Sequence, residues 1–152
     1  MQRAKPQLSL KGRALRYLSQ REHSRKELER KLAKHAQDPA EIARALDDLQ
    51  ARGFIDHSRV AESVVHRKAS KLGAMRIRQE LQAKGVEPEL VAASVARLKA
   101  TELERAREVW RKKFGALPAD LNERARHVRF LAARGFGGEV INALLRTVTT
   151  AE

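Results

Sequence analysis

The sequence predicts an all-α protein, an elongated tandem array of three three-helix repeats that resemble helix-turn-helix units. Three observations predict it. The first is composition: the 152 residues include 24 Ala and 18 Leu beside many Arg, Lys, Glu and Gln, whereas only six are aromatic. The former are good helix formers, and strand-forming aromatic residues are scarce. The other two are recurring helix start and stop signals and an internal repeat.

In the first repeat, helix signals begin with an amphipathic segment over residues 10–20 that carries Leu15 and Leu18. Ser24 with Glu27 forms a capping box at the start of a second helix, because each side chain can bond the other residue's backbone N–H. Asp38-Pro39 supplies an N-cap and a proline at the first helical position, and the third helix runs to Ala51 before Arg52-Gly53.

The same signals recur downstream. Pro88 repeats the proline start of a helix that runs to Lys99. Lys84-Gly85 and Arg134-Gly135 are typical helix ends, because glycine readily adopts the left-handed backbone of a C-terminal cap. Two further amphipathic helices are expected over residues 58–72 and 103–114.

Aligning the helix ends shows the internal repeat. Leu32, Leu81 and Leu131 correspond at spacings of 49 and 50 residues. The residues four, ten and fourteen positions later also correspond, and they are Ala36, Gly85 and Gly135, then Ile42, Val91 and Ile141, then Leu46, Val95 and Leu145. The third copy is longer, and its Gly115–Pro118 stretch predicts a loop. Repeats this small usually bury their apolar faces against neighbours, which favours an elongated, curved row.

We therefore expect a flexible N-terminal segment over residues 1–9, followed by repeats over 10–56, 57–100 and 101–148 and a tail over 149–152. The chain contains no cysteine, which excludes disulfides, thiol catalysis and cysteine-ligated metals. Its start resembles no signal peptide, and no apolar run is long enough to span a membrane, so we expect a cytoplasmic protein.

Catalytic and cofactor motifs are weak in this sequence. The five histidines lack the spacing of metal ligands, and no phosphate-binding glycine loop is present. Asp56-His57 resembles an acid–base pair, but Asp56 also stands where the next helix needs an N-cap. Gly137-Gly138 has no preceding strand, so it does not indicate a nucleotide site. We expect no enzyme activity, no cofactor and no metal.

Positive charge is the most informative feature. The net charge is +13 and the isoelectric point is about 10.9, a balance that favours a polyanion or an acidic protein surface as partner. Each repeat contributes, with net charges of +6, +4 and +3 over residues 1–60, 61–100 and 101–152. The alternative is a solvated face with i,i+4 ion pairs such as Glu27 with Lys31. Our candidate contacts lie on the second helix of each repeat and form one basic stripe if the repeats stack: Arg25, Lys26, Arg30, Lys34, Lys71, Arg76, Arg78, Lys84, Arg124, Arg126, Arg129 and Arg134.

A helix-turn-helix would place the third helix of each repeat in the DNA major groove. Residues 39–51 and 88–99 are the helices in question, and Glu41, Asp47, Asp48, Glu87 and Glu89 lie in or beside them. These carboxylates would face phosphates, so sequence-specific duplex recognition is not the first hypothesis.

Four segments of the sequence resemble motifs of one known family, and they occur in the same order along the chain. The segments REHSRKELERKL from Arg21, LDDLQARGFID from Leu46, RIRQELQAKGV from Arg76 and FLAARGF from Phe130 resemble motifs of the bacterial regulatory protein RecX family, and the match extends from about Leu10 to Val148. The chain departs from the family pattern at His57, Val60, Ala36 and Ala74-Met75. The family's turn geometry is therefore not carried over to these positions.

The resemblance implies a function that is not catalytic. Family members bind the RecA filament on single-stranded DNA and restrain its ATP hydrolysis, strand exchange and co-protease function, thereby tuning recombination, DNA repair and the SOS response. It implies the RecA filament on single-stranded DNA as the partner. The resemblance assigns neither direct DNA binding, which we expect to be weak, nor an oligomeric state, for which we favour a monomer. It assigns no catalytic residue, so the site candidates remain the basic stripe. The alternative is a basic architectural protein that recognises the phosphate backbone of nucleic acid.

Overall fold

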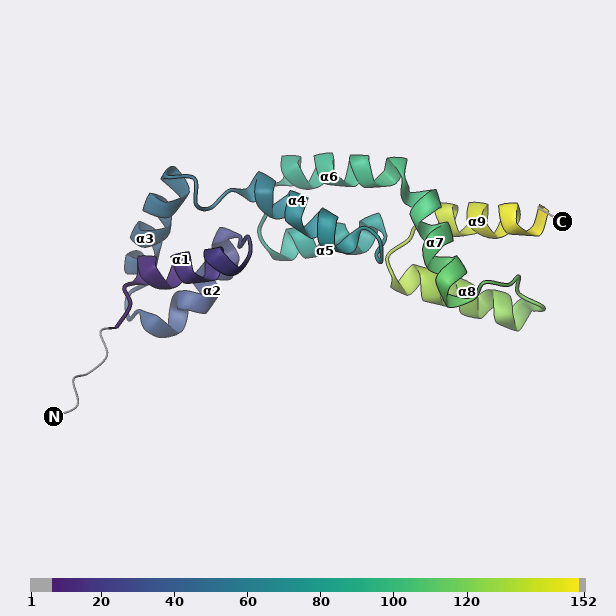
Figure 1. Cartoon of the computed structure of the whole chain (residues 1–152), viewed down its shortest axis with the longest axis horizontal. Helices are drawn as coiled ribbons and strands as arrows, with labels where there is room; N and C mark the ends of the chain where they lie inside the picture. Colours follow the sequence, from purple (N-terminus) through teal and green to yellow (C-terminus); the bar gives the residue numbers. More distant parts are fainter. Residues whose placement is uncertain (1–6, 151–152) are drawn as a thin grey trace. The chain divides into compact units, whose positions relative to one another are not determined.

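The computed structural model describes residues 7–150, and the side chains of residues 7–146. Within that part it contains nine α-helices and one short 3₁₀ turn, with no strand (Figure 1). The prediction of an all-α protein with three three-helix repeats is confirmed, whereas an elongated row stays a prediction. The chain divides into two compact units, one up to Val60 together with Lys84–Val86, the other formed by Ala61–Ala83 and the residues from Glu87 onward.

The first repeat consists of α1 (Leu10–Gln20), α2 (Arg25–Leu32) and α3 (Pro39–Ala51). The three helices pack against one another, and the side chains buried between them are mostly aliphatic (Figure 1). The buried set is Ala14, Leu28, Leu32, Ile42, Leu46, Leu49 and Ile55.

The predicted helix starts are confirmed. The Ser24 hydroxyl accepts from the Glu27 backbone N–H at 3.2 Å, and Glu27 Oε1 accepts from the Ser24 N–H at 3.1 Å, which completes the capping box. Asp38 Oδ1 accepts from the Ala40 N–H at 2.9 Å. Asp56 Oδ1 accepts from the Ser58 N–H at 2.9 Å, so Asp56 caps a helix, as the sequence predicts.

The second repeat consists of α4 (His57–Lys68), α5 (Ala74–Ala83) and α6 (Pro88–Ala100). Helix α4 ends four residues before the predicted Leu72. Just after this end, the carbonyls of Ala69 and Leu72 accept from the guanidinium Nη1 of Arg105 on α7 (Glu102–Lys113), at 2.8 Å each. These carbonyls are therefore satisfied outside a helix.

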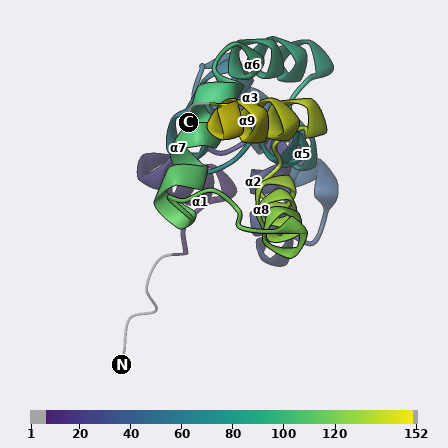
Figure 2. The same ribbon diagram turned by 90° about the vertical axis from the view of Figure 1, so that its right-hand side faces the viewer.

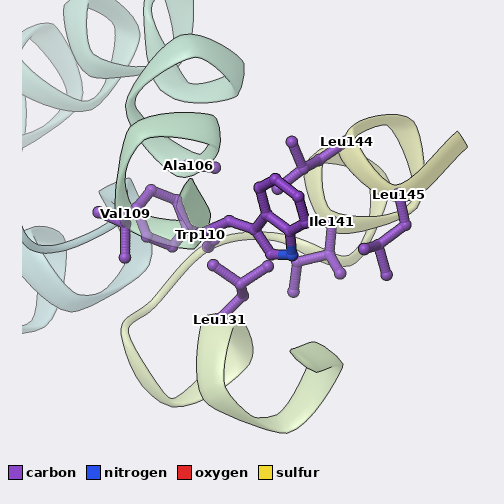
Figure 3. Close-up of a cluster of buried hydrophobic side chains, with 8 residues drawn as sticks. Ala106, Val109, Trp110, Leu131, Ile141, Leu144 and Leu145 are labelled. Carbon is purple, nitrogen blue, oxygen red and sulfur yellow. The ribbon is translucent and has the colours of Figure 1, made fainter. Parts of the chain in front are cut away.

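The third repeat consists of α7, α8 (Leu121–Ala133) and α9 (Gly138–Thr150), with the predicted loop between the first two. Helix α9 packs on both α7 and α8 (Figure 2). Its core differs from that of the first repeat, because Trp110 of α7 lies among Leu131, Ile141 and Leu144 (Figure 3).

The predicted helix ends hold at Gly85 and Gly135, which adopt φ values of +77° and +92°. The first repeat differs: Ala36 has φ −135°, and α2 ends through a 3₁₀ turn over Ala33–His35. An alanine would be strained in the left-handed conformation, and this turn avoids it.

Candidate nucleic-acid interface

The first repeat leaves three of its four candidate basic side chains free. Lys26 and Arg30 are exposed on α2, and Lys34 is exposed in the 3₁₀ turn. Within the described residues, no hydrogen bond or ion pair engages their charged groups. They are therefore available to an outside anion.

Arg25 is different, because its guanidinium is used inside the protein. It contacts Asp47 at 2.7 Å and Glu29 at 3.2 Å, and it donates to the amide oxygen of Gln50 at 3.0 Å. These partners tie α2 to α3. The contact also neutralises one carboxylate of α3, the helix that a helix-turn-helix would place on DNA.

In the second repeat, the prediction that four basic residues share one helix is wrong for two of them. Arg76 and Arg78 lie on α5, but Lys71 lies in the turn before it and Lys84 follows its end. Helix α5 begins at Ala74, after Lys71, and ends at Ala83, so Lys84 falls in the turn that contains Gly85. Arg78 and Lys71 are exposed without an internal partner, whereas Arg76 Nη1 donates to the carbonyl of Ala133 at 2.7 Å.

Lys84 belongs to a charge cluster around Glu27. Its ammonium lies 3.1 Å from Glu27 Oε1, and Arg21 lies 2.7 Å from Oε2, with both Lys84 and Glu27 side chains about 15% exposed. Burial on its own raises the pKa of Glu27, but the hydrogen bonds from Arg21, the Ser24 backbone and Lys84 outweigh it and lower the pKa to about 2. Lys84 is thus a structural cation.

In the third repeat, Arg126 and Arg129 are exposed on α8, and Arg124 is half-buried without an internal partner. The guanidinium of Arg134 lies 5.0 Å from the ring centroid of Phe130, at a distance typical of a cation–π contact. Arg134 therefore has a packing role at the end of α8.

The twelve candidates thus divide into two groups. Four are engaged within the fold: Arg25, Arg76, Lys84 and Arg134. Eight have charged groups without an internal partner among the described residues, and we call these the free cations: Lys26, Arg30, Lys34, Lys71, Arg78, Arg124, Arg126 and Arg129. Their continuity across the repeats as one stripe stays a prediction.

The structure adds one group that the helix-by-helix analysis missed. Arg13 of α1, Lys34 and His35 line a cavity of about 340 Å³. His35 is exposed, and partial desolvation by its neighbours, together with the positive charges of Arg13 and Lys34, lowers its pKa. No sequence signal joins Arg13 to the other two, since they lie about twenty residues apart and meet only through packing.

Two of the histidines, His23 and His57, have local structural roles. His23 is buried, with Nδ1 3.0 Å from the carbonyl of Arg21 and Nε2 2.8 Å from the ammonium of Lys31. His57 Nε2 accepts from the Arg25 N–H at 3.2 Å, so Asp56-His57 joins a cap to a helix start. Among the described residues, no group of histidines and carboxylates is arranged to hold a metal ion, and no helix is long and apolar enough to cross a bilayer.

Three family models match the chain in tandem. They are described as the first, second and third three-helix domains of RecX, and they match residues 11–49, 56–95 and 100–145. The chain belongs to the RecX family. A regulatory protein RecX of Leptothrix cholodnii is 58% identical over 142 residues, which cover 93% of this chain and 90% of the relative. The regulatory protein RecX of Herminiimonas arsenicoxydans is 48% identical, with 94% and 95% covered.

A solved structure agrees on the fold. The crystal structure of RecX from Lactobacillus salivarius superimposes with a TM-score of 0.78, covering 92% of this chain and 94% of that one, at 21% identity. The relatives are named regulatory proteins, so a regulatory role follows from membership of the family. The resemblance found in the sequence is confirmed.

Proposed function

We propose that this RecX protein binds the RecA filament on single-stranded DNA and inhibits or modulates RecA's ATPase, strand exchange and co-protease activity. The observation that carries the proposal is membership of a family of regulatory proteins named RecX over nearly the whole chain.

The free cations support a polyanionic partner. They occur in all three repeats, and each keeps its charge unpaired within the described residues. A filament on DNA offers both phosphates and acidic protein surface, so cations on several linked repeats can make many weak contacts at once.

The primary test is the single-strand-dependent ATP hydrolysis of RecA with this protein titrated in. Binding of the protein to the same DNA without RecA is measured at matched salt. We expect inhibition at concentrations far below those that coat the DNA, together with stronger binding to RecA-coated DNA than to bare DNA. Inhibition only where the protein coats the DNA would overturn the proposal.

A charge-reversal variant tests the free cations. One exposed residue is changed in each repeat: Arg30→Glu, Arg78→Glu and Arg129→Glu. The matched control makes the same charge change at exposed positions outside the candidate set: Arg16→Glu, Arg44→Glu and Arg107→Glu. We expect the first variant to lose filament affinity at least about tenfold more than the control, with helical circular dichroism unchanged. Equal losses would remove these positions from the interface.

Arg76 and Lys84 are unsuitable for this test, although the sequence alone recommends reversing them with Arg78. Reversal would also break the contacts with Ala133 and Glu27, so lost affinity would report a disturbed fold.

The alternative function is a basic architectural protein that recognises the phosphate backbone, which the net charge of +13 favours. Salt dependence separates the two. An architectural protein binds bare DNA with an affinity that falls steeply with salt, and RecA adds nothing to that affinity.

A further inference from the structure

The cavity beside the 3₁₀ turn of the first repeat carries only positive charge. Its volume is about 340 Å³, and its polar residues are Gln7, Arg13, Lys34, His35 and Gln37. No carboxylate is among the described residues that line it, whereas three further cavities in the described part of the chain each contain at least one glutamate. An unbalanced positive charge therefore distinguishes this cavity.

The three basic side chains of the cavity have no partner within the described part of the chain. Arg13 is half-buried on α1, Lys34 and His35 are exposed in the turn, and no hydrogen bond or ion pair engages their charged groups. The charged groups that face the His35 imidazole are Arg13 from α1 and Lys34 from its own turn, and both lower its pKa, in addition to partial desolvation. The three groups therefore repel one another when His35 is protonated.

The repeat pattern shows that His35 differs from its counterparts. His35, Lys84 and Arg134 correspond at spacings of 49 and 50 residues. Lys84 pairs with Glu27 at 3.1 Å, and the guanidinium of Arg134 lies 5.0 Å from the ring centroid of Phe130. His35 has neither kind of partner among the described residues. A position that contributes to the fold in two repeats is thus open to an outside ligand in the first.

The donors of this cavity suit a phosphate group. A guanidinium offers a fork of N–H donors, an ammonium offers three, and a protonated imidazole and the two carboxamides add others. The oxygens of a phosphate are arranged tetrahedrally, so donors on different sides of a cavity can reach different oxygens, whereas a carboxylate has two oxygens in one plane. The six residues before Gln7 add Arg3 and Lys5 and no carboxylate, so the adjoining sequence supplies no counter-charge.

We propose that this cavity binds one phosphate group through Arg13, Lys34 and protonated His35. A backbone phosphate of nucleic acid and free phosphate share this chemistry, and with nucleic acid as the source the inference rests on the nucleic-acid contact in the proposed function. His35 is positive only when it is protonated, so a bound phosphate raises its pKa. By the same coupling, the affinity for the phosphate rises as the pH falls.

The test measures the pKa of His35 by proton NMR of the full-length protein, with the imidazole signal identified by its loss in His35→Gln. The pH titration is performed in inorganic phosphate, with a single-stranded oligothymidylate that lacks terminal phosphates, and in sodium chloride at matched ionic strength. We expect inorganic phosphate and the oligonucleotide each to raise the pKa above its value in chloride. No rise with either would overturn the inference.

Where the oligonucleotide raises the pKa, its affinity gives a second measurement, because each phosphodiester keeps one negative charge throughout the titration. From about pH 8 to about pH 5, its affinity for the unaltered protein should increase about fivefold more than its affinity for His35→Gln. One exposed charge pair is worth at most about that factor. Equal increases in the two proteins would contradict the role of His35.

A pair of matched double variants tests the two permanent cations. Arg13→Gln with Lys34→Gln removes them, and Arg16→Gln with Arg44→Gln removes two exposed cations of the same repeat outside the cavity. We expect the rise in the His35 pKa to be lost in the first variant and kept in the second, with helical circular dichroism unchanged. Equal rises in both would overturn the inference. If the first variant loses helical circular dichroism, Lys34→Gln alone, at an exposed position, replaces it.

The same measurements separate this inference from the proposed function. A protein that inhibits RecA but shows no rise in the His35 pKa with either probe would retain the proposed function and lose the phosphate site. A rise without any binding to the RecA filament would retain the site and contradict the proposed function. A rise with inorganic phosphate but not with the oligonucleotide would support the site with free phosphate as its ligand.

Discussion

Two turns of the same sequence pattern dock in different ways. Lys84-Gly85 ends α5 and lies against the start of α2, where a Cβ on Gly85 would meet the flexible Lys26 side chain at 3.3 Å. Arg134-Gly135 ends α8 and lies against the start of α5, where a Cβ on Gly135 would lie 2.6 Å from the backbone N of Arg76. The first contact is made by side-chain atoms alone, whereas the second also involves the backbone of α5.

Hydrogen bonds follow the same division. At the second turn, the Gly73 N–H donates to the Arg134 carbonyl at 2.8 Å and the Met75 N–H to the Gly135 carbonyl at 3.2 Å. At the first turn, the Lys84–Glu27 ion pair holds the contact. A repeated motif can therefore join neighbouring repeats through charge at one place and through close backbone packing at another.

Gly135→Ala should have the largest effect. The new Cβ would crowd the backbone N of Arg76 together with its Cβ and Cγ, and the φ of +92° is itself unfavourable for alanine, so we expect a loss of about 4 kcal/mol in unfolding free energy. Gly85→Ala should cost about 1–2 kcal/mol, because the Lys26 side chain can give way. Urea unfolding followed by circular dichroism measures both. Gly53→Ala, with φ +81° and no neighbour within 4 Å, gives the cost of the backbone alone, and equal losses at Gly85 and Gly135 would contradict the comparison.

Glu27→Gln should reduce the unfolding free energy by about 2–3 kcal/mol at neutral pH, because Arg21 and Lys84 lose the negative charge that both of them contact. The Glu27 pKa is lowered from 4.5 to about 2, so its contribution is present above about pH 4.5 and is lost as the pH falls toward 2. Between these pH values, the unfolding free energy of Glu27→Gln should therefore change less with pH than that of the unaltered protein. Lys68→Met, which removes a more exposed pair with Glu80, is the control and should change little.

Arg76→Met should cost about 1 kcal/mol, since it removes the hydrogen bond to Ala133 at the second turn. Arg78→Met, two residues away and without an internal partner, should leave stability unchanged. Thermal unfolding of the two variants distinguishes a structural arginine from a free one. A larger effect at Arg78 would mean that the division into engaged and free cations is wrong.

His127 should give the smallest effect, through pH. Trp110 Nε1 donates to His127 Nδ1 at 3.0 Å, which requires a neutral imidazole, and burial lowers the pKa of His127. Stability is therefore complete above the unfolded pKa of about 6.5 and declines below it, by at most about 1.4 kcal/mol at pH 5.5. His127→Leu, which restores the residue type of Leu28 in the first repeat, should reduce this decline in melting temperature. The part due to His23, whose pKa burial also lowers, should remain.

Local signals accounted for most of the fold. The Ser24 capping box, the Asp38 and Asp56 caps and the glycine ends at residues 53, 85 and 135 all depend on residues within a few positions of one another, so the sequence alone predicts them. The predicted end of α4 at Leu72 is four residues late, and no local pattern indicates that Arg105 of another helix binds the carbonyls of Ala69 and Leu72.

The sequence by itself determined the all-α repeats, the excess of positive charge and the family, because periodicity, caps and composition are properties of the chain. Only the tertiary structure decided which cations remain free. Arg76 and Arg78 look alike in the sequence, but a carbonyl 57 residues away engages one and not the other. Such pairings depend on packing between distant segments, which no local pattern encodes.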